Sequence, residues 1–178
     1  IPYLRKVYWF LFFFSGFMQS LPAQDSRLYA FTNYTVKDGL ASYNTQSVVQ
    51  DEQGYIWIGT INGLQRFDGT RFITFRHNPA DPHALPDNYI YQLHIDKEQH
   101  LWVLLNNGKI GIFDTRRFVF KEVKIRLKNQ RHLTAIRSLL EDSGGNLFYV
   151  IPHEEILTFS QKNNEFAAVH NPFDSPPN

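Results

Sequence analysis

The feature that most constrains the fold is an internal repeat with a spacing of 45 or 46 residues. Three copies begin at Ser47, Tyr91 and Arg137. In each copy a large aromatic residue follows an aspartate by six positions, and a phenylalanine comes later in the unit. These anchors are Asp51, Trp57 and Phe67, then Asp96, Trp102 and Phe113, then Asp142, Phe148 and Phe159. A period of this length is typical of propeller blades and of helical HEAT-type repeats.

The local pattern separates these two possibilities. Each copy contains four short apolar runs of about five residues, divided by turn residues such as Asn62-Gly63 and Asp68-Gly69. Short strands joined by Asn-Gly or Asp-Gly read as β-hairpins, and no segment after residue 25 keeps a helical period for three turns. The sequence therefore predicts an all-β fold of three four-stranded antiparallel β-propeller blades, part of an incomplete ring expected to have seven. The glycine anchors of the repeat are Gly59, Gly63 and Gly108.

The strands can be placed along the chain from these runs. We predict strands at 46–51, 55–60, 63–67 and 71–76, at 89–95, 100–105, 109–114 and 118–123, and at 134–141, 146–151, 155–159 and 165–169. Leu28 to Tyr34 is predicted as an additional, ring-closing strand. The predicted organisation is a signal peptide (1–23), a lead-in (24–45), blade 1 (46–78), a linker (79–88), blade 2 (89–125), a linker (126–133), blade 3 (134–170) and the start of a linker to a missing blade (171–178).

The first residues have the pattern of an export signal. Arg5 and Lys6 precede an apolar run of 12 residues, Val7 to Met18, and small residues follow, so we place cleavage after Ala23. A membrane-spanning helix needs about 20 apolar residues, which is longer than this run. We therefore predict an exported protein, and because the chain begins with Ile1 we read it as a fragment.

Composition excludes several classes of function. The chain has no cysteine, which excludes disulfides, thiolate metal ligands and a cysteine nucleophile. Removing the first 23 residues takes away Arg5 and Lys6 but no acid, so the formal charge falls from +1 to −1. A chain this close to neutral gives no reason to expect a nucleic-acid partner. No cofactor motif and no zinc-type histidine spacing is present, so neither a cofactor nor a metal site is predicted.

One copy of the repeat carries a family signature. Asp38-Gly39-Leu40, Val48-Val49-Gln50-Asp51, Gly54 to Thr60, Asn62-Gly63-Leu64 and Arg66 to Gly69 closely resemble the two-component regulator propeller repeat. The linker Asp81 to Asn88 also resembles that family. The third copy departs from it, since Phe148 replaces the tryptophan and Glu154 replaces the turn glycine.

The resemblance implies a function. Members of this family are periplasmic sensor regions of membrane-bound hybrid two-component histidine kinases of the Bacteroidetes type. It therefore implies a non-catalytic region that senses an oligosaccharide and controls transcription of glycan-use genes, in a membrane-anchored and homodimeric parent protein. The kinase would lie outside this chain.

Two other functions remain open, an exported propeller enzyme acting on polysaccharide and a secreted protein-binding scaffold. The enzyme would need converging acids, or a Tyr, His and Arg cluster, in the central funnel.

Each candidate site residue also has a structural interpretation. Trp57 and Trp102 could stack on a sugar, but their repeated position favours packing between sheets. The three repeat aspartates could be acids, but turn closure is the better interpretation. Glu154-Glu155 lies at a predicted hairpin tip, and the basic run 121–131 fits a solvated face better than an anion site. His77 belongs to a repeated linker. No catalytic residue is therefore predicted, and the ligand-binding residues remain unknown.

Overall fold

The computed structural model describes residues 30–127, 137–152 and 155–168. The chain divides into two units, 1–33 and 34–178, and only residues 30–33 of the first are described. The predicted signal peptide and the end of the third repeat lie outside the described residues. Among these residues, helical structure is limited to one 3₁₀ turn, Val36–Asp38, and no helix has the length and apolar character needed to cross a membrane.

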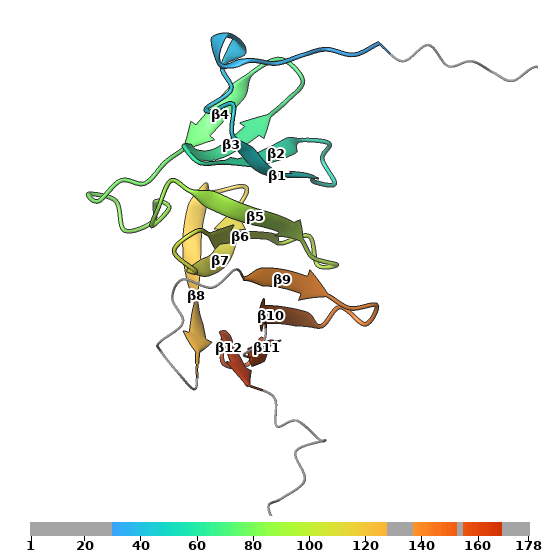
Figure 1. The fold of residues 1–178 in the computed structure, drawn as a ribbon, viewed down its shortest axis with the longest axis vertical. Helices are drawn as coiled ribbons and strands as arrows, with labels where there is room; N and C mark the ends of the chain where they lie inside the picture. Colours follow the sequence, from blue (N-terminus) through green and yellow to red (C-terminus); the bar gives the residue numbers. More distant parts are fainter. Residues whose placement is uncertain (1–29, 128–136, 153–154, 169–178) are drawn as a thin grey trace, which may run out of the picture. The chain divides into compact units, whose positions relative to one another are not determined.

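Twelve strands follow in the described part of the chain, in three groups of four (Figure 1). Within each group neighbouring strands pair antiparallel, as expected for propeller blades. The predicted fold class is confirmed, and the strands lie close to the predicted ranges. Blade 1 comprises β1 (Thr45–Gln50), β2 (Ile56–Thr60), β3 (Gly63–Phe67) and β4 (Phe72–Phe75). Blade 2 comprises β5 (Ile90–Ile95), β6 (Leu101–Leu105), β7 (Ile110–Asp114) and β8 (Val119–Arg126). Blade 3 comprises β9 (Ser138–Glu141), β10 (Leu147–Ile151), β11 (Glu155–Ser160) and β12 (Glu165–Ala168).

One strand pairing was not predicted. β8 has eight residues, whereas β4 and β12 have four each, and the end of β8 runs parallel to β12. Lys124, Ile125 and Arg126 pair with Glu165, Phe166 and Ala167. Blades 2 and 3 are therefore joined at β8 and β12 into one eight-stranded sheet, while blade 1 remains a separate sheet.

Residues 30–34 of the predicted ring-closing segment, Leu28 to Tyr34, form no strand in the described part of the chain. A strand exists only beside a hydrogen-bonded neighbour, and none of the twelve strands pairs with this segment. Instead, Tyr34 packs its ring edge-on against Phe67, with 4.8 Å between ring centroids. Gln65 then ties the lead-in to blade 1, accepting from the Ala41 N–H at 2.7 Å and donating to the Gly39 carbonyl oxygen at 2.9 Å.

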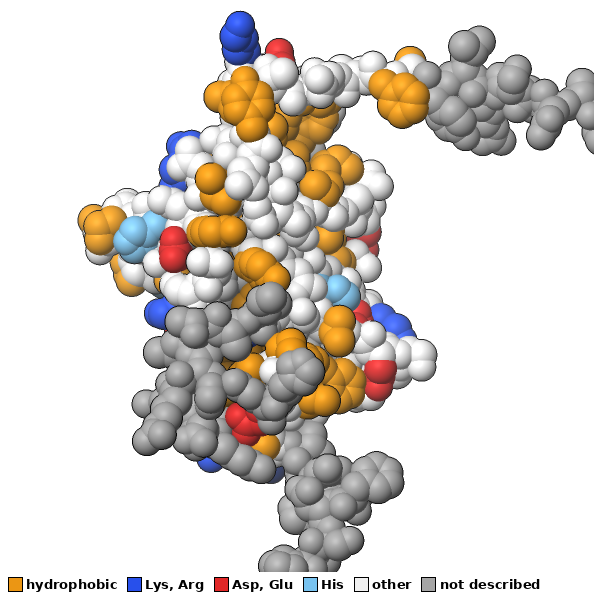
Figure 2. Space-filling model, in the orientation of Figure 1, with side chains coloured by type: hydrophobic (Ala, Val, Ile, Leu, Met, Phe, Trp, Pro, Cys, Tyr) orange, Lys and Arg blue, Asp and Glu red, His pale blue; other side chains and the backbone are white. Residues whose placement is uncertain are grey.

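Two apolar cores lie between successive blades. The first joins blades 1 and 2 and contains Trp57, Leu64, Leu85, Ile90, Leu93, Leu101, Val103, Leu105, Phe113 and Phe120. The second joins blades 2 and 3 and contains Trp102, Leu104, Ile110, Val123, Leu139, Leu147, Tyr149, Ile151, Leu157 and Phe166. Blades 1 and 2 thus each bury one face against the blade that follows. The far face of blade 3 keeps apolar side chains exposed, with Leu140 53% and Ile156 59% exposed, and Figure 2 shows hydrophobic side chains reaching the surface over this blade.

The linker between blades 1 and 2 is held by specific contacts. The backbone N–H of His77 donates to Asn88 Oδ1 at 2.8 Å, and the His77 Nδ1 lies 2.8 Å from the Leu85 carbonyl oxygen. Leu85 itself is buried in the first core. The carbonyl oxygen of His83 accepts from the Phe120 N–H at 2.9 Å, so the linker also covers part of the β8 edge.

Candidate ligand site

The repeat aspartates each organise the turn between the first two strands of a blade. Asp51 Oδ1 accepts from the Tyr55 N–H at 2.8 Å, and its Oδ2 accepts from the indole N–H of Trp57 at 2.7 Å. Asp96 repeats this arrangement, with Oδ1 accepting from the His100 N–H and Oδ2 from the indole of Trp102, both at 2.8 Å. A carboxylate used in this way fixes the turn and satisfies a buried indole donor.

The third repeat reaches the same geometry with different residues. Phe148 stands where the other copies have tryptophan, and its side chain has no N–H to donate. The side-chain amide of Asn146 takes its place and donates to Asp142 Oδ2 at 2.8 Å, while Asp142 Oδ1 accepts from the Asn146 and Gly144 N–H groups at 2.8 Å. The Asn146 hydrogen bond holds the pKa of the Asp142 carboxyl below its ordinary value. Asp142 is exposed, whereas Asp96 is 7% exposed.

The aromatic anchors meet between blades. Trp57 contacts Phe113 of the next blade with ring centroids 5.7 Å apart, and Trp102 contacts Phe159 at 4.9 Å, both edge-on. Trp57 and Trp102 are 0% and 1% exposed, so neither offers a face for stacking on a sugar. Tyr34 occupies the corresponding position against Phe67.

The glycine anchors have two separate roles. A Cβ on Gly59 would lie 2.7 Å from Ile90 Cγ2, so the missing side chain lets blade 2 approach blade 1 closely. Gly63 and Gly108 adopt positive φ angles of 121° and 84°, which favour glycine in the turn between the second and third strands.

The first strands of neighbouring blades are also joined by hydrogen bonds that sequence reasoning missed. Ser47 Oγ accepts from the Leu93 N–H at 3.0 Å and lies 3.5 Å from its carbonyl oxygen. The side-chain amide of Gln92 makes the same two contacts with Leu139. Its Oε1 accepts from the Leu139 N–H at 2.9 Å, and its Nε2 donates to the Leu139 carbonyl oxygen at 2.8 Å. Ser47 and Gln92 are repeat-equivalent, and Ser138 follows in blade 3. A polar residue at this position in all three copies was the available signal.

Two polar grooves lie between the blades, on the side of the turns that the aspartates organise. Groove 1, between blades 1 and 2, has a volume of about 460 Å³ and groove 2, between blades 2 and 3, about 480 Å³. The polar groups lining groove 1 include Glu52, Gln53, Glu98, Gln99, Arg116 and Lys121. Those lining groove 2 include Lys97, Glu98, His100, Glu141, Asn146 and Gln161. Carboxylates, amides and ammonium groups together suit a ligand rich in hydroxyl groups, which both donate and accept.

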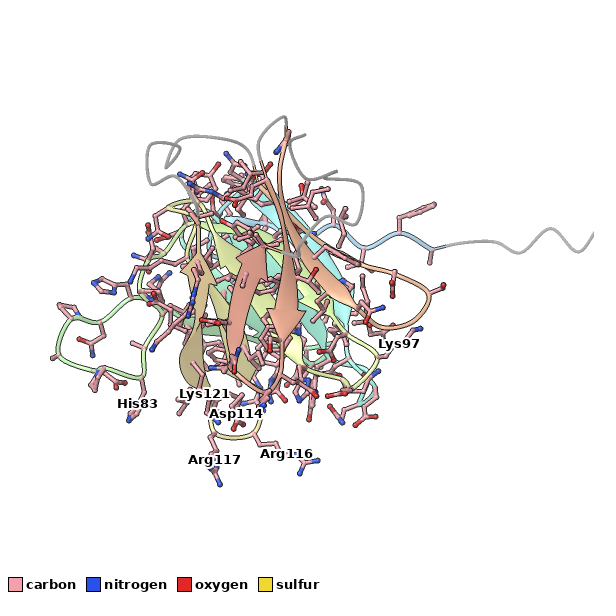
Figure 3. All side chains as sticks on the ribbon, turned by 90° about the horizontal axis from the view of Figure 1, so that it is seen from below. His83, Lys97, Asp114, Arg116, Arg117 and Lys121 are labelled. Atoms are coloured by element: carbon pink, nitrogen blue, oxygen red, sulfur yellow. The ribbon has the colours of Figure 1, made fainter. Side chains whose placement is uncertain are left out.

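The two cations that line groove 1 come from the β7–β8 turn, which carries Arg116, and from β8, which carries Lys121. Figure 3 shows Arg116 and Arg117 at the tip of this turn, pointing away from the sheets, with Asp114 and Lys121 close to it. Asp114 Oδ1 accepts from the Arg117 and Arg116 N–H groups at 2.9 and 3.1 Å. These hydrogen bonds, that of Arg117 foremost, hold the pKa of the Asp114 carboxyl below its ordinary value.

The remaining part of the predicted basic run is described only as far as Leu127. Lys124 is exposed, and Arg126 donates to Glu165 at 3.0 Å beside the β8–β12 pairing. Lys128, Arg131 and Glu154 lie outside the described residues, so the predicted Glu154-Glu155 pair is not described as a whole. No group of three or more metal-ligating side chains occurs in the described ranges.

A smaller hollow of about 290 Å³ lies between blades 2 and 3, lined in part by Gly108 and Tyr149. The Tyr149 hydroxyl donates to the Gly108 carbonyl oxygen at 3.0 Å, and burial raises the pKa of that hydroxyl to about 12. The hydroxyl thus holds the β6–β7 turn against β10.

Comparison with known proteins bears on the repeat. Residues 39–62 match the family model described as two component regulator propeller, which confirms the predicted resemblance over that segment. Histidine kinase P4 of Formosa agariphila is 41% identical over 68 residues, which make up 38% of this chain and 5% of that protein.

Solved structures share the fold. The extracellular domain of a hybrid two component system from B. thetaiotaomicron superimposes with a TM-score of 0.66 at 19% identity, over 78% of this chain and 20% of that one. A second such extracellular domain from B. thetaiotaomicron superimposes with a TM-score of 0.56 at 24% identity, over 72% of this chain and 19% of that one. Virginiamycin B lyase from Staphylococcus aureus superimposes with a TM-score of 0.53 at 16% identity, over 72% of this chain and 42% of that one. The chain therefore spans about a fifth of the first two structures, and these likenesses show a shared fold alone.

Proposed function

Because residues 39–62 carry a two component regulator propeller repeat, we propose that this chain is part of the sensing region of a membrane-bound hybrid histidine kinase. The observation that carries this proposal is the 41% identity over 68 residues to a histidine kinase. The similar fold of extracellular domains from two-component systems supports an exported, periplasmic position.

A non-catalytic role is supported by how the repeat carboxylates are used. General acid–base catalysis needs a carboxyl group free to exchange a proton with the substrate. Asp51 and Asp96 instead accept hydrogen bonds from a turn N–H and a buried indole, and Asp142 accepts from its own turn. Each serves the fold of its blade.

The ligand we propose is an oligosaccharide bound between blades. The two grooves present carboxylate, amide and ammonium groups side by side, which is the mixture that sugar hydroxyls require. Volumes of about 460 and 480 Å³ fall in the usual range for small-ligand sites.

Signalling would follow if the ligand binds one arrangement of the sensing region more tightly than another. A ligand shifts an equilibrium between two arrangements of a sensor only as far as its affinities for them differ. A saccharide that contacts two blades at once stabilises one spacing of those blades. In the homodimeric parent this difference would bias the kinase, and through it transcription of glycan-use genes.

The test uses the full-length protein in membrane vesicles and a panel of defined oligosaccharides. Sensing predicts that one class of saccharide raises the melting temperature of the exported region and changes autophosphorylation, without being consumed. Conversion of a saccharide to a smaller product would instead identify an enzyme, and a panel without effect on either readout would overturn the proposal.

A further inference from the structure

The two grooves are related by the repeat, and this relation separates structural residues from groove-specific ones. Asp51 and Phe113 of groove 1 correspond to Asp96 and Phe159 of groove 2, and both pairs serve the turn and the core. Other positions differ. Lys121 of groove 1 corresponds to Ala167, which does not line groove 2. The side chains that differ between the grooves are therefore not set by the repeated turn and core contacts.

Groove 2 is bridged by its own side chains. The backbone N–H of Lys97 donates to Glu141 Oε1 at 3.1 Å, and its ammonium group donates to the Ser143 carbonyl oxygen. The amide of Gln161 donates to both carboxylate oxygens of Glu98, at 3.0 and 3.2 Å. The polar groups of blade 2 are thus already bonded to blade 3, and a ligand would have to displace these bonds.

Groove 1 has no such bridge. Among the described residues, no hydrogen bond or ion pair crosses from the β1–β2 turn to the β5–β6 or β7–β8 turn. The Gln53 amide donates to its neighbour Glu52 at 2.7 Å. The side chains of Gln99, Arg116 and Lys121 form no hydrogen bond and no close ion pair with other described residues, although the Lys121 charge helps to lower the pKa of the nearby Asp114 carboxyl. Donors and acceptors on both walls of groove 1 are therefore available to a ligand.

The charge of groove 1 limits what that ligand can be. Its lining has four carboxylates, from Asp51, Glu52, Glu98 and Asp114, against the cations Arg116 and Lys121. These acidic and basic lining groups carry a formal charge of −2, and Arg117, whose charge also acts on Asp114, brings the sum to −1. Charges within a Debye length of about 10 Å repel a ligand of the same sign. A uronate or a sulfated sugar is disfavoured, whereas uncharged hydroxyls can donate to the carboxylates and accept from the cations.

We propose that groove 1 is the ligand site and that it takes an oligosaccharide whose contacting units are uncharged. The inference rests on the proposed sensing function and adds the site and the ligand class to it. Glu52 on blade 1 and Lys121 on blade 2 lie on the two sides of the groove, so the same sugar contacts both blades.

The experiment is calorimetric titration of the complete exported region with tetrasaccharides. The uncharged probes are tetrasaccharides of glucose, mannose, galactose and xylose, and the acidic probes are tetragalacturonate and a carrageenan tetrasaccharide. We expect an uncharged probe to bind, with an affinity that changes less than about two-fold between roughly 0.05 and 0.5 M salt. Glu52→Ala and Lys121→Ala should each weaken it about five-fold, the effect of losing one hydrogen bond.

Lys124→Ala is the matched control, because Lys124 is exposed on the same strand but does not line the groove. Binding that is unchanged in both groove variants would overturn the site while leaving the sensing function intact. Salt-sensitive binding of an acidic probe alone would overturn the ligand class. If no saccharide binds, the sensing of oligosaccharides fails, and this inference fails with it.

Discussion

Replacing Asp96 by alanine should destabilise the fold far more than the same change at its repeat-equivalent, Asp142. Asp96 accepts hydrogen bonds from the His100 N–H and the Trp102 indole at 2.8 Å, and His100 Nδ1 lies 3.0 Å from its Oδ2. Trp102 is 1% exposed, so its indole N–H would lose its acceptor inside the second core. An unsatisfied buried donor costs about 1–3 kcal/mol, and the lost turn bond adds about 1 kcal/mol.

The expected loss for Asp96→Ala is therefore about 3 kcal/mol, which corresponds to roughly 6–12 °C in melting temperature for a domain of this size. Asp142 and its donor Asn146 are exposed, so water can replace the lost bonds, and Asp142→Ala should shift the midpoint much less. Thermal unfolding followed by near-ultraviolet circular dichroism measures both variants. Equal losses, or a neutral Asp96→Ala, would refute the view that the buried carboxylate–indole bond stabilises blade 2.

Acid should destabilise the fold through the same carboxyl group. Burial raises the pKa of Asp96, but hydrogen bonds from Trp102 and His100 outweigh that effect and hold the pKa below its ordinary value. The stabilisation that ionised Asp96 provides is therefore fully present above the pKa of the unfolded chain, about 3.9, and is lost as pH falls through the lower pKa of the folded protein. Asp96→Asn should remove this dependence, so the free energy of unfolding of the variant should fall less steeply in acid. Tyr149, with its pKa raised to about 12, contributes stability below pH 10 that is lost as pH rises through 12. Tyr149→Phe should lose about 1 kcal/mol at neutral pH and lack that alkaline dependence, as measured by urea unfolding. Ser47→Ala should cost about 1 kcal/mol by removing a bond between blades, whereas Ser138→Ala, with no described partner blade, should be close to neutral in the same assay. The isolated three-blade polypeptide should self-associate through the exposed face of blade 3, and Leu140→Lys should reduce that association in analytical ultracentrifugation; a sharp cooperative melt from a wild-type monomer would contradict this.

The strands could be predicted because their signals are local. Asn62-Gly63 and Asp68-Gly69 mark turns within one blade, and the period of 45 or 46 residues carries the pattern from one blade to the next. The aromatic anchors were recognisable for the same reason. Their pairing across blades, Trp57 with Phe113 and Trp102 with Phe159, depends on how the blades stack.

The other features of the fold and of the candidate site depend on contacts between residues far apart in the sequence, which no local pattern encodes. The β8–β12 pairing requires the end of β8 to meet residues that come 41 positions later in the sequence, in another blade. Tyr34 covers Phe67 as an irregular segment, although its apolar neighbours resembled a strand. Groove 1 combines Glu52 and Lys121, which lie 69 positions apart in the sequence. Individually these two are ordinary surface residues, and only the stacking of blades 1 and 2 brings them to one groove.

The most direct test is a crystal structure of the complete exported region with an uncharged tetrasaccharide that binds in solution. We predict the sugar in groove 1, with hydroxyl groups within hydrogen-bond distance of Glu52 on one side and of Lys121 on the other. A sugar bound in the centre of the propeller ring, in groove 2 or at a contact between protomers, with groove 1 empty, would contradict the assignment.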